Sequence, residues 1–159
     1  MNKESHTNNT LHVIDDYNLL IDNISTLWIT AKEKAVVSVN TELLEANWQT
    51  GKYIVEFEQG GKARAEYGKH LLINLSKDLT LKNGRGFSRS NLLYMRKFYL
   101  SFPKRETVSH VLTWSHYFEI LKCDDLLEMQ FYFRQCITEG WKVRELKRQM
   151  KSCLFQRLA

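Results

Sequence analysis

An all-α fold is predicted by three observations on this 159-residue sequence. Apolar residues recur at spacings of three and four, strictly alternating runs are short, and the chain holds one proline and seven glycines. A repeat of three to four residues is typical of helices with one buried face, and few prolines and glycines leave few helix breaks. We therefore expect a single helical domain over residues 15–159, with a long N-terminal helix, after a flexible N-terminus at residues 1–14.

The boundaries of the helices follow from caps and breakers. We expect helices over residues 15–28, 30–58, 66–82, 89–102, 114–122, 125–139 and from 142 to the C-terminus. Ser88 is a natural N-cap, Asp124 or Asp125 can open the sixth helix, and Gly140 can end it. Gly51 stands inside the second helix, where glycine costs about 1 kcal/mol relative to alanine. A close crossing with another helix would explain it. Residues 108–113 alternate weakly, and we favour a loop or helical turn there over a short strand.

Several classes of protein are excluded by composition. No run of eighteen apolar residues exists, so a membrane span is not expected, and the polar start lacks the apolar core of a secretory signal. The three cysteines lack the C-x-x-C spacing of zinc or redox sites, and we expect reduced thiols in a cytoplasmic protein. Zinc ligation by a cysteine with His110 or His116 is disfavoured by the same spacing. We expect no metal and no cofactor.

The charge is distributed unevenly along the chain, and this indicates a partner. Residues 1–60 hold four Lys/Arg against nine Asp/Glu, whereas residues 62–105 hold eleven against two. Residues 142–159 hold six against one. Basic stripes of this density attract polyanions by releasing condensed counterions, although a solvated surface that binds nothing is the alternative.

The pair of helices around residues 83–88 is the most informative part of the sequence. Two helices joined by a short glycine-containing turn predict a helix-turn-helix, winged-helix-like core at about residues 66–102, whose second helix enters the major groove of duplex DNA. Arginine and asparagine read guanine and adenine edges, and a helix N-terminus attracts phosphate. The candidate DNA-binding residues are Arg85, Ser88, Arg89, Asn91, Arg96 and Lys97. A secondary basic zone comprises Lys142, Arg144, Lys147 and Arg148.

A series of short motifs in fixed order resembles a bacterial family. They are Tyr67-Gly68, Leu71-Leu72, Leu75-Ser76, Gly86-Phe87-Ser88, Asn91-Leu92, Met95-Arg96, Phe98-Tyr99, Phe102-Pro103, Leu112-Thr113-Trp114-Ser115-His116, Phe131-Tyr132 and Trp141 with Arg144-Glu145-Leu146 and Gln149. From about Ile24 onward, the chain is similar to the YhcG-like proteins, sometimes labelled predicted nucleases. The resemblance implies an N-terminal domain of unknown function, thought to bind DNA, which a PD-(D/E)XK nuclease domain normally follows. Lys142 departs from the pattern, because a serine usually follows this tryptophan and could cap a helix.

Catalytic chemistry is not expected within these residues. Glu145-Leu146-Lys147 spells E-x-K with Asp124 and Asp125 upstream, but a PD-(D/E)XK site needs these groups on adjacent strands sharing a metal. In a helix, residues i and i+2 face apart, so we interpret the triplet as a solvated helix face. No third group completes a triad with Ser115 and His116, and we expect His116 to form hydrogen bonds within the fold. For Trp48, Trp114 and Trp141 we favour core packing over stacking on nucleic-acid bases.

A protein-interaction or dimerisation module is the alternative function. The acidic N-terminal helix and the long helix after it could pair with another copy, and the homodimer would present two basic helices. The two functions are compatible, since dimeric DNA-binding proteins place two recognition helices about one DNA turn apart.

Overall fold

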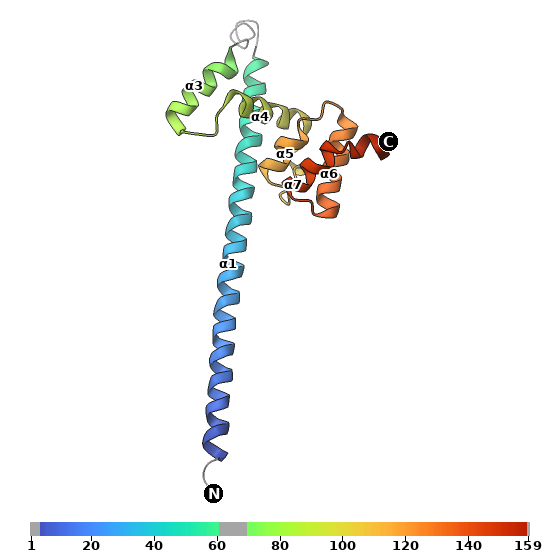
Figure 1. Ribbon diagram of the computed structural model, residues 1–159. Coiled ribbons are helices and arrows are strands. Elements are labelled where there is room, and N and C mark those ends of the chain that lie inside the picture. Colours follow the sequence, from blue (N-terminus) through green and yellow to red (C-terminus); the bar gives the residue numbers. More distant parts are fainter. Residues whose placement is uncertain (1–3, 61–69, 159) are drawn as a thin grey trace. The chain divides into compact units, whose positions relative to one another are not determined.

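The computed structural model describes residues 4–60 and 70–158, and all its regular elements are helices (Figure 1). Their order is α1 (Glu4–Glu58), α3 (Leu71–Asn83), α4 (Arg89–Ser101), the 3-10 turn η1 (Arg105–Thr107), α5 (Trp114–Ile120), α6 (Leu126–Glu139), α7 (Val143–Lys151) and α8 (Leu154–Leu158). The all-α prediction is confirmed. Over the described ranges there is no strand, so the winged-helix-like arrangement stays a prediction. Within the same ranges, no helix is both long and apolar enough to cross a membrane.

Several predicted boundaries differ from the structure. One helix, α1, replaces the two helices predicted at 15–28 and 30–58, and it begins at Glu4, inside the stretch predicted to be flexible. No glycine or proline separates Trp28 from Thr30, so the backbone hydrogen bonds continue through both. The predicted start of the third helix at Glu66 lies outside the described residues. The single helix predicted from Lys142 onward is wrong, because Cys153 adopts φ 52° and separates α7 from α8.

The chain forms two compact units, Met1–Val39 and Asn40–Ala159, and the second contains the core. Phe98 of α4 lies at its centre, with its ring centroid 4.6 Å from that of Tyr117 and 5.4 Å from that of Trp114. Trp48 of α1 is buried there and donates from Nε1 to the carbonyl oxygen of Phe102 at 2.8 Å. Core packing is thus confirmed for Trp48, while Trp114 and Trp141 are half-buried at its edge.

Gly51 marks a close approach of two helices, as the sequence predicts. A β-carbon at this position would lie 2.0 Å from the carbonyl oxygen of Met95 in α4, far inside van der Waals contact. Ile54, one turn further along α1, packs with Leu92 and Met95 in the same region. The absence of a side chain at Gly51 is therefore what lets the two backbones meet.

Candidate nucleic-acid interface

The turn between α3 and α4 has the local structure that the sequence predicts. Gly84 and Gly86 have φ values of 84° and 112°, a region that side chains disfavour. Ser88 is the N-cap of α4, and its hydroxyl accepts a hydrogen bond from the backbone N–H of Asn91 at 3.1 Å. Arg85 and Arg89 are exposed beside this cap. Among the described residues, neither has a hydrogen bond or ion pair from its side chain, so both guanidiniums are available to an anion.

Asn91 has a different position from the one predicted for a base-reading residue. Its Nδ2 donates to the carbonyl oxygen of Gly86, and its Oδ1 accepts from Nε1 of Trp114 at 3.0 Å. Both ends of the amide are therefore occupied within the fold. Asn91 holds the glycine turn against α5, and these two contacts fix the orientation of its amide.

Arg96 and Lys97 are also used by the fold. Arg96 Nε lies 2.7 Å from Oε2 of Glu58 at the end of α1. Lys97 Nζ donates to the carbonyl oxygen of Cys123 at 3.0 Å and lies 3.7 Å from a carboxylate oxygen of Asp124. These contacts join α4 to α1 and to the segment before α6. Of the six residues predicted around the turn, Arg85, Ser88 and Arg89 remain together on the surface.

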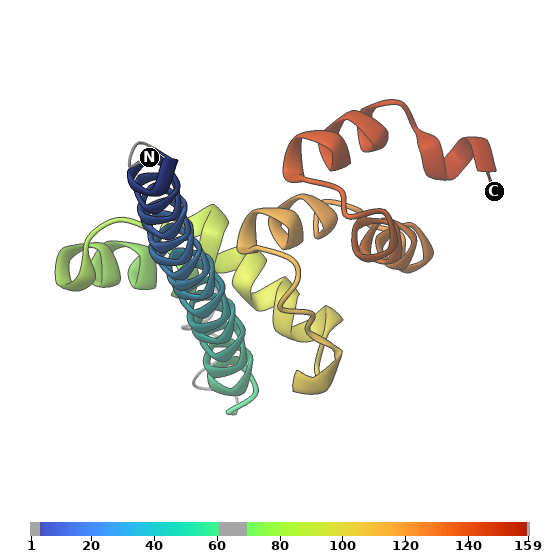
Figure 2. The same cartoon turned by 90° about the horizontal axis from the view of Figure 1, so that it is seen from below.

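A second pair of helices with a glycine turn lies near the C-terminus. Gly140, in the left-handed conformation at φ 63°, ends α6, and only Trp141 and Lys142 separate it from α7. Helices α5, α6 and α7 each contact the other two and lie beside one another in Figure 2. The mutual contacts make a three-helix unit in which α7 is the last long helix.

His116 fixes the position of the turn before α7. Its Nδ1 accepts from the backbone N–H of Thr113 at 3.1 Å. Its Nε2 therefore carries the hydrogen and donates to the carbonyl oxygen of Trp141 at 2.9 Å. The prediction that His116 forms hydrogen bonds within the fold is confirmed. Lys142 is the N-cap of α7 and forms no side-chain cap, as its departure from the family's serine implies.

The two faces of α7 differ sharply in polarity. Leu146 is completely buried, and Val143 and Met150 are half-buried on the same side. The exposed residues of α7 and of its N-cap include a set of basic residues that we call the α7 basic face: Lys142 at the N-cap and Arg144, Lys147, Arg148 and Lys151 on the helix. With Gly140, Trp141 and Glu145 they line an open hollow of about 600 Å³. The structure thus places three residues of the predicted secondary zone on α7 and the fourth, Lys142, at the N-cap of that helix.

Carboxylates neutralise part of this face. Arg148 forms an ion pair with Glu145 at 2.6 Å. The hydrogen bond from the guanidinium in this pair lowers the pKa of the Glu145 carboxyl below its usual value. Lys147 Nζ lies 3.3 Å from a carboxylate oxygen of the buried Glu119. Lys142, Arg144 and Lys151 have no side-chain hydrogen bond or ion pair within the described part of the chain. These three cations carry the uncompensated charge.

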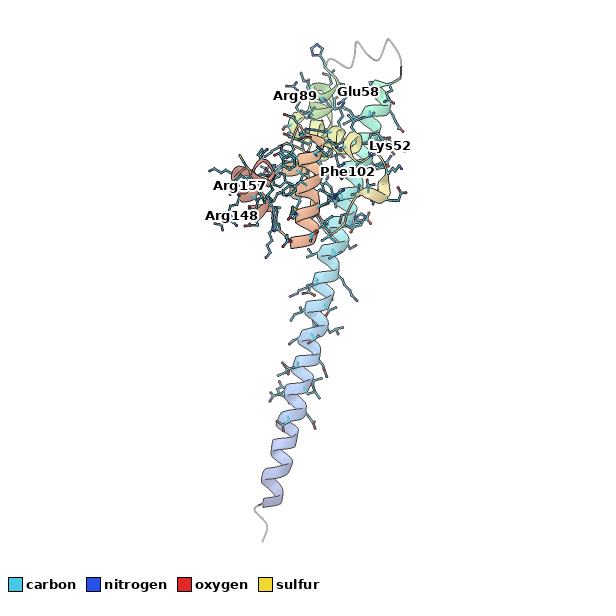
Figure 3. All side chains as sticks on the ribbon, turned by 90° about the vertical axis from the view of Figure 1, so that its right-hand side faces the viewer. Lys52, Glu58, Arg89, Phe102, Arg148 and Arg157 are labelled. Atoms are coloured by element: carbon cyan, nitrogen blue, oxygen red, sulfur yellow. The ribbon has the colours of Figure 1, made fainter. Side chains whose placement is uncertain are left out.

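Two further cations of this region, Lys151 and Arg157, were not among the site residues predicted from the sequence. Lys151 lies seven residues after Arg144, hence two turns along the same helix side, and this spacing could have identified it. Arg157 follows on α8. Figure 3 shows Arg148 and Arg157 on the C-terminal helices, with Arg89 apart from both. Residues 4–60 and 70–158 therefore contain at least two separate basic zones, one at the turn before α4 and one on α7.

No metal-binding arrangement is found in the described residues 4–60 and 70–158. Over these ranges, no group of three His, Cys, Asp or Glu side chains could hold a metal ion. Glu145 and Lys147 of the E-x-K triplet lie on α7 and contact different partners, Arg148 and Glu119. Burial raises the pKa values of the Cys123 and Cys136 thiols to about 11, so both stay protonated at neutral pH.

Residues 23–157 match the family model described as the DUF1016 N-terminal domain. The chain belongs to the DUF1016 N-terminal domain family. It is also 35% identical over 173 aligned residues to the protein named "Putative nuclease YhcG" from Escherichia coli (strain K12). That alignment covers 89% of this chain and 46% of the relative, so this DUF1016 N-terminal domain spans about half the length of the curated protein it matches. The YhcG-like resemblance is confirmed. No solved structure matches this DUF1016 N-terminal domain significantly.

Proposed function

We propose that this chain is a DNA-binding module, without catalytic groups of its own, that serves a nuclease. The observation that carries the proposal is the α7 basic face, which lies opposite a buried leucine on the helix after a glycine turn. Helix-turn-helix proteins present their recognition helix in this way, supported by two other helices and with cations toward the phosphates. The name of the relative, a putative nuclease, supports a nucleic acid as the polyanion.

The turn before α4 supplies a second contact in this proposal. Arg85 and Arg89 flank the N-terminus of α4, where unpaired backbone N–H groups add positive potential. Because guanidiniums match phosphate and guanine geometry, these two residues can grip the backbone or read a base edge. Duplex DNA is the expected target, because a helix of the size of α7 fits the major groove.

Binding of the chain to a labelled DNA duplex should weaken steeply as salt rises. With roughly five phosphates neutralised, affinity should fall by on the order of 10²–10³-fold between 50 and 200 mM salt. In the Arg85→Ala/Arg89→Ala variant, the binding free energy should weaken by about 1–3 kcal/mol for each arginine removed, and its salt dependence should be shallower. The variant should remain folded, because both side chains are exposed. Fluorescence anisotropy at several salt concentrations measures both quantities. A chain that binds no duplex at low salt would contradict the proposal, and unchanged affinity in the double variant would exclude the turn.

The chain alone should not cleave DNA in Mg²⁺ or Mn²⁺. The reason is that Glu145 and Lys147 lie on a helix and not on paired strands where two carboxylates could share a metal. Incubation of supercoiled plasmid with the purified chain, followed on agarose gels, checks this. Metal-dependent nicking that persists through purification and disappears in Glu145→Ala would restore the E-x-K triplet as a catalytic site.

A further inference from the structure

The first unit of the chain exposes an apolar surface on α1. Leu20, Ile24, Leu27 and Trp28 are 52%, 48%, 68% and 62% exposed. They belong to a larger exposed apolar set, which also holds Tyr17, Leu19, Ile21, Ile29, Val36 and Val39. Proteins that stay monomeric scatter such residues singly, whereas a contiguous apolar surface marks a place where another molecule binds.

Several residues of this set, together with Ala31, lie in one continuous line along the helix. Tyr17, Leu20, Ile24, Leu27 and Ala31 are separated by three, four, three and four residues, the spacing of the facing positions in a coiled coil. Ile21, Trp28 and Ala35 recur every seven residues directly beside this line. We call these eight residues the α1 seam. It covers about 27 Å of helix at 1.5 Å per residue.

We propose that the α1 seam pairs with the α1 seam of a second copy of this chain, with the two helices antiparallel. The seam is complementary to itself in this orientation. When Ile24 of one copy faces Leu27 of the other, Leu20 faces Ala31, so a large side chain meets a small one. In the same register, Trp28 of one copy lies beside Ile21 of the other. Each contact occurs twice, as a two-fold symmetric interface requires.

Charged residues select the antiparallel orientation. The next facing position after Ala31 is Lys34. In a parallel pair, Lys34 would face Lys34 of the other copy at the contact, and the two like charges would repel. In the antiparallel pair, Lys34 faces Tyr17 of the other copy, next to Asp16. An ammonium group is then placed against an aromatic ring and a carboxylate, both of which attract it.

The mass of the chain in solution tests whether the seam pairs. Light scattering after size exclusion should give twice 18.8 kDa for the chain at tens of micromolar. Ile24→Glu should give the monomer, since it places a carboxylate in the seam of each copy. Ile29→Glu is the matched control, because Ile29 is also an exposed isoleucine of α1 and lies outside the seam. A monomeric wild-type chain would overturn the proposal and assign the seam to a different protein. Dissociation by Ile29→Glu as well would also overturn it.

Cross-linking tests the orientation. The background is the Cys153→Ser variant, which lacks the exposed cysteine and keeps the buried Cys123 and Cys136. One variant adds Tyr17→Cys to this background, and a second adds Lys34→Cys. After mixing and re-equilibration, a short bis-maleimide should join Tyr17→Cys to Lys34→Cys and give a dimer band on a denaturing gel. Neither variant alone should do so. A dimer band from Tyr17→Cys alone would show a parallel pair and overturn the proposed orientation. The inference is independent of DNA binding, and both tests are done without DNA.

Discussion

Gly51→Ala should lower the free energy of unfolding by about 2–4 kcal/mol, and Gly51→Val by more. The added β-carbon would lie 2.0 Å from the carbonyl oxygen of Met95. Because that atom belongs to the backbone of α4, no side-chain rotation relieves the clash, and α1 and α4 have to separate. Overpacking of a core costs about 1–3 kcal/mol, and more where backbone has to move. Separation would also loosen Ile54, Leu92 and Met95, which are buried at the same place.

Urea unfolding, monitored by circular dichroism, measures this change in the free energy of unfolding. The sign of the change distinguishes the two possible effects of Gly51→Ala. Alanine is favoured over glycine in a helix by about 1 kcal/mol, so propensity alone predicts that Gly51→Ala stabilises the chain. The close approach predicts the opposite. Glu56→Ala, at an exposed position five residues later in α1, is the control and should stay within about 0.5 kcal/mol of wild type. All variants are compared at one protein concentration, because self-association would shift the apparent stability. Stabilisation by Gly51→Ala would contradict the close contact.

Arg144→Glu/Lys151→Glu should weaken duplex binding at low salt by at least about 100-fold. The two cations lie two turns apart on the α7 basic face and are not engaged by any carboxylate of the described residues. If the proposed DNA binding depends on phosphate neutralisation, reversal of each charge removes an attraction to phosphate and adds a repulsion. The helix itself should remain intact, because both side chains are exposed and the favourable effect of a glutamate near the N-terminus of α7 offsets the unfavourable effect of one at its C-terminus.

The matched control is Lys77→Glu/Lys104→Glu, which changes the net charge equally at exposed positions outside both basic zones. We expect it to weaken binding only several-fold and to keep most of the salt dependence. Anisotropy titrations of both variants and wild type, with thermal melts to confirm folding, make the comparison. Equal losses in the two variants would show that net charge, and not α7, determines the affinity.

The sequence predicted those parts of the fold that depend on neighbouring residues. The N-cap at Ser88, the cap at Asp125 and the left-handed end at Gly140 are each read from one residue and its local backbone. Helical periodicity likewise placed Leu146 on the buried side of α7. Gly51 could be assigned to a close crossing because glycine inside a helix is costly without such a reason.

The tertiary structure alone decided which of the candidate DNA-binding residues form contacts within the fold. Arg96 pairs with Glu58, 38 residues away, Lys97 contacts Cys123, 26 residues away, and Asn91 contacts Trp114, 23 residues away. Helical spacing shows which side of a helix a residue occupies, and it contains no information on the element that covers that side. The sequence therefore determined the all-helical fold, its caps and its basic segments. Packing between distant helices determined which cations are neutralised, because ion pairs form wherever folding brings opposite charges within reach. The same packing left the cations of α7 and of the turn before α4 facing solvent.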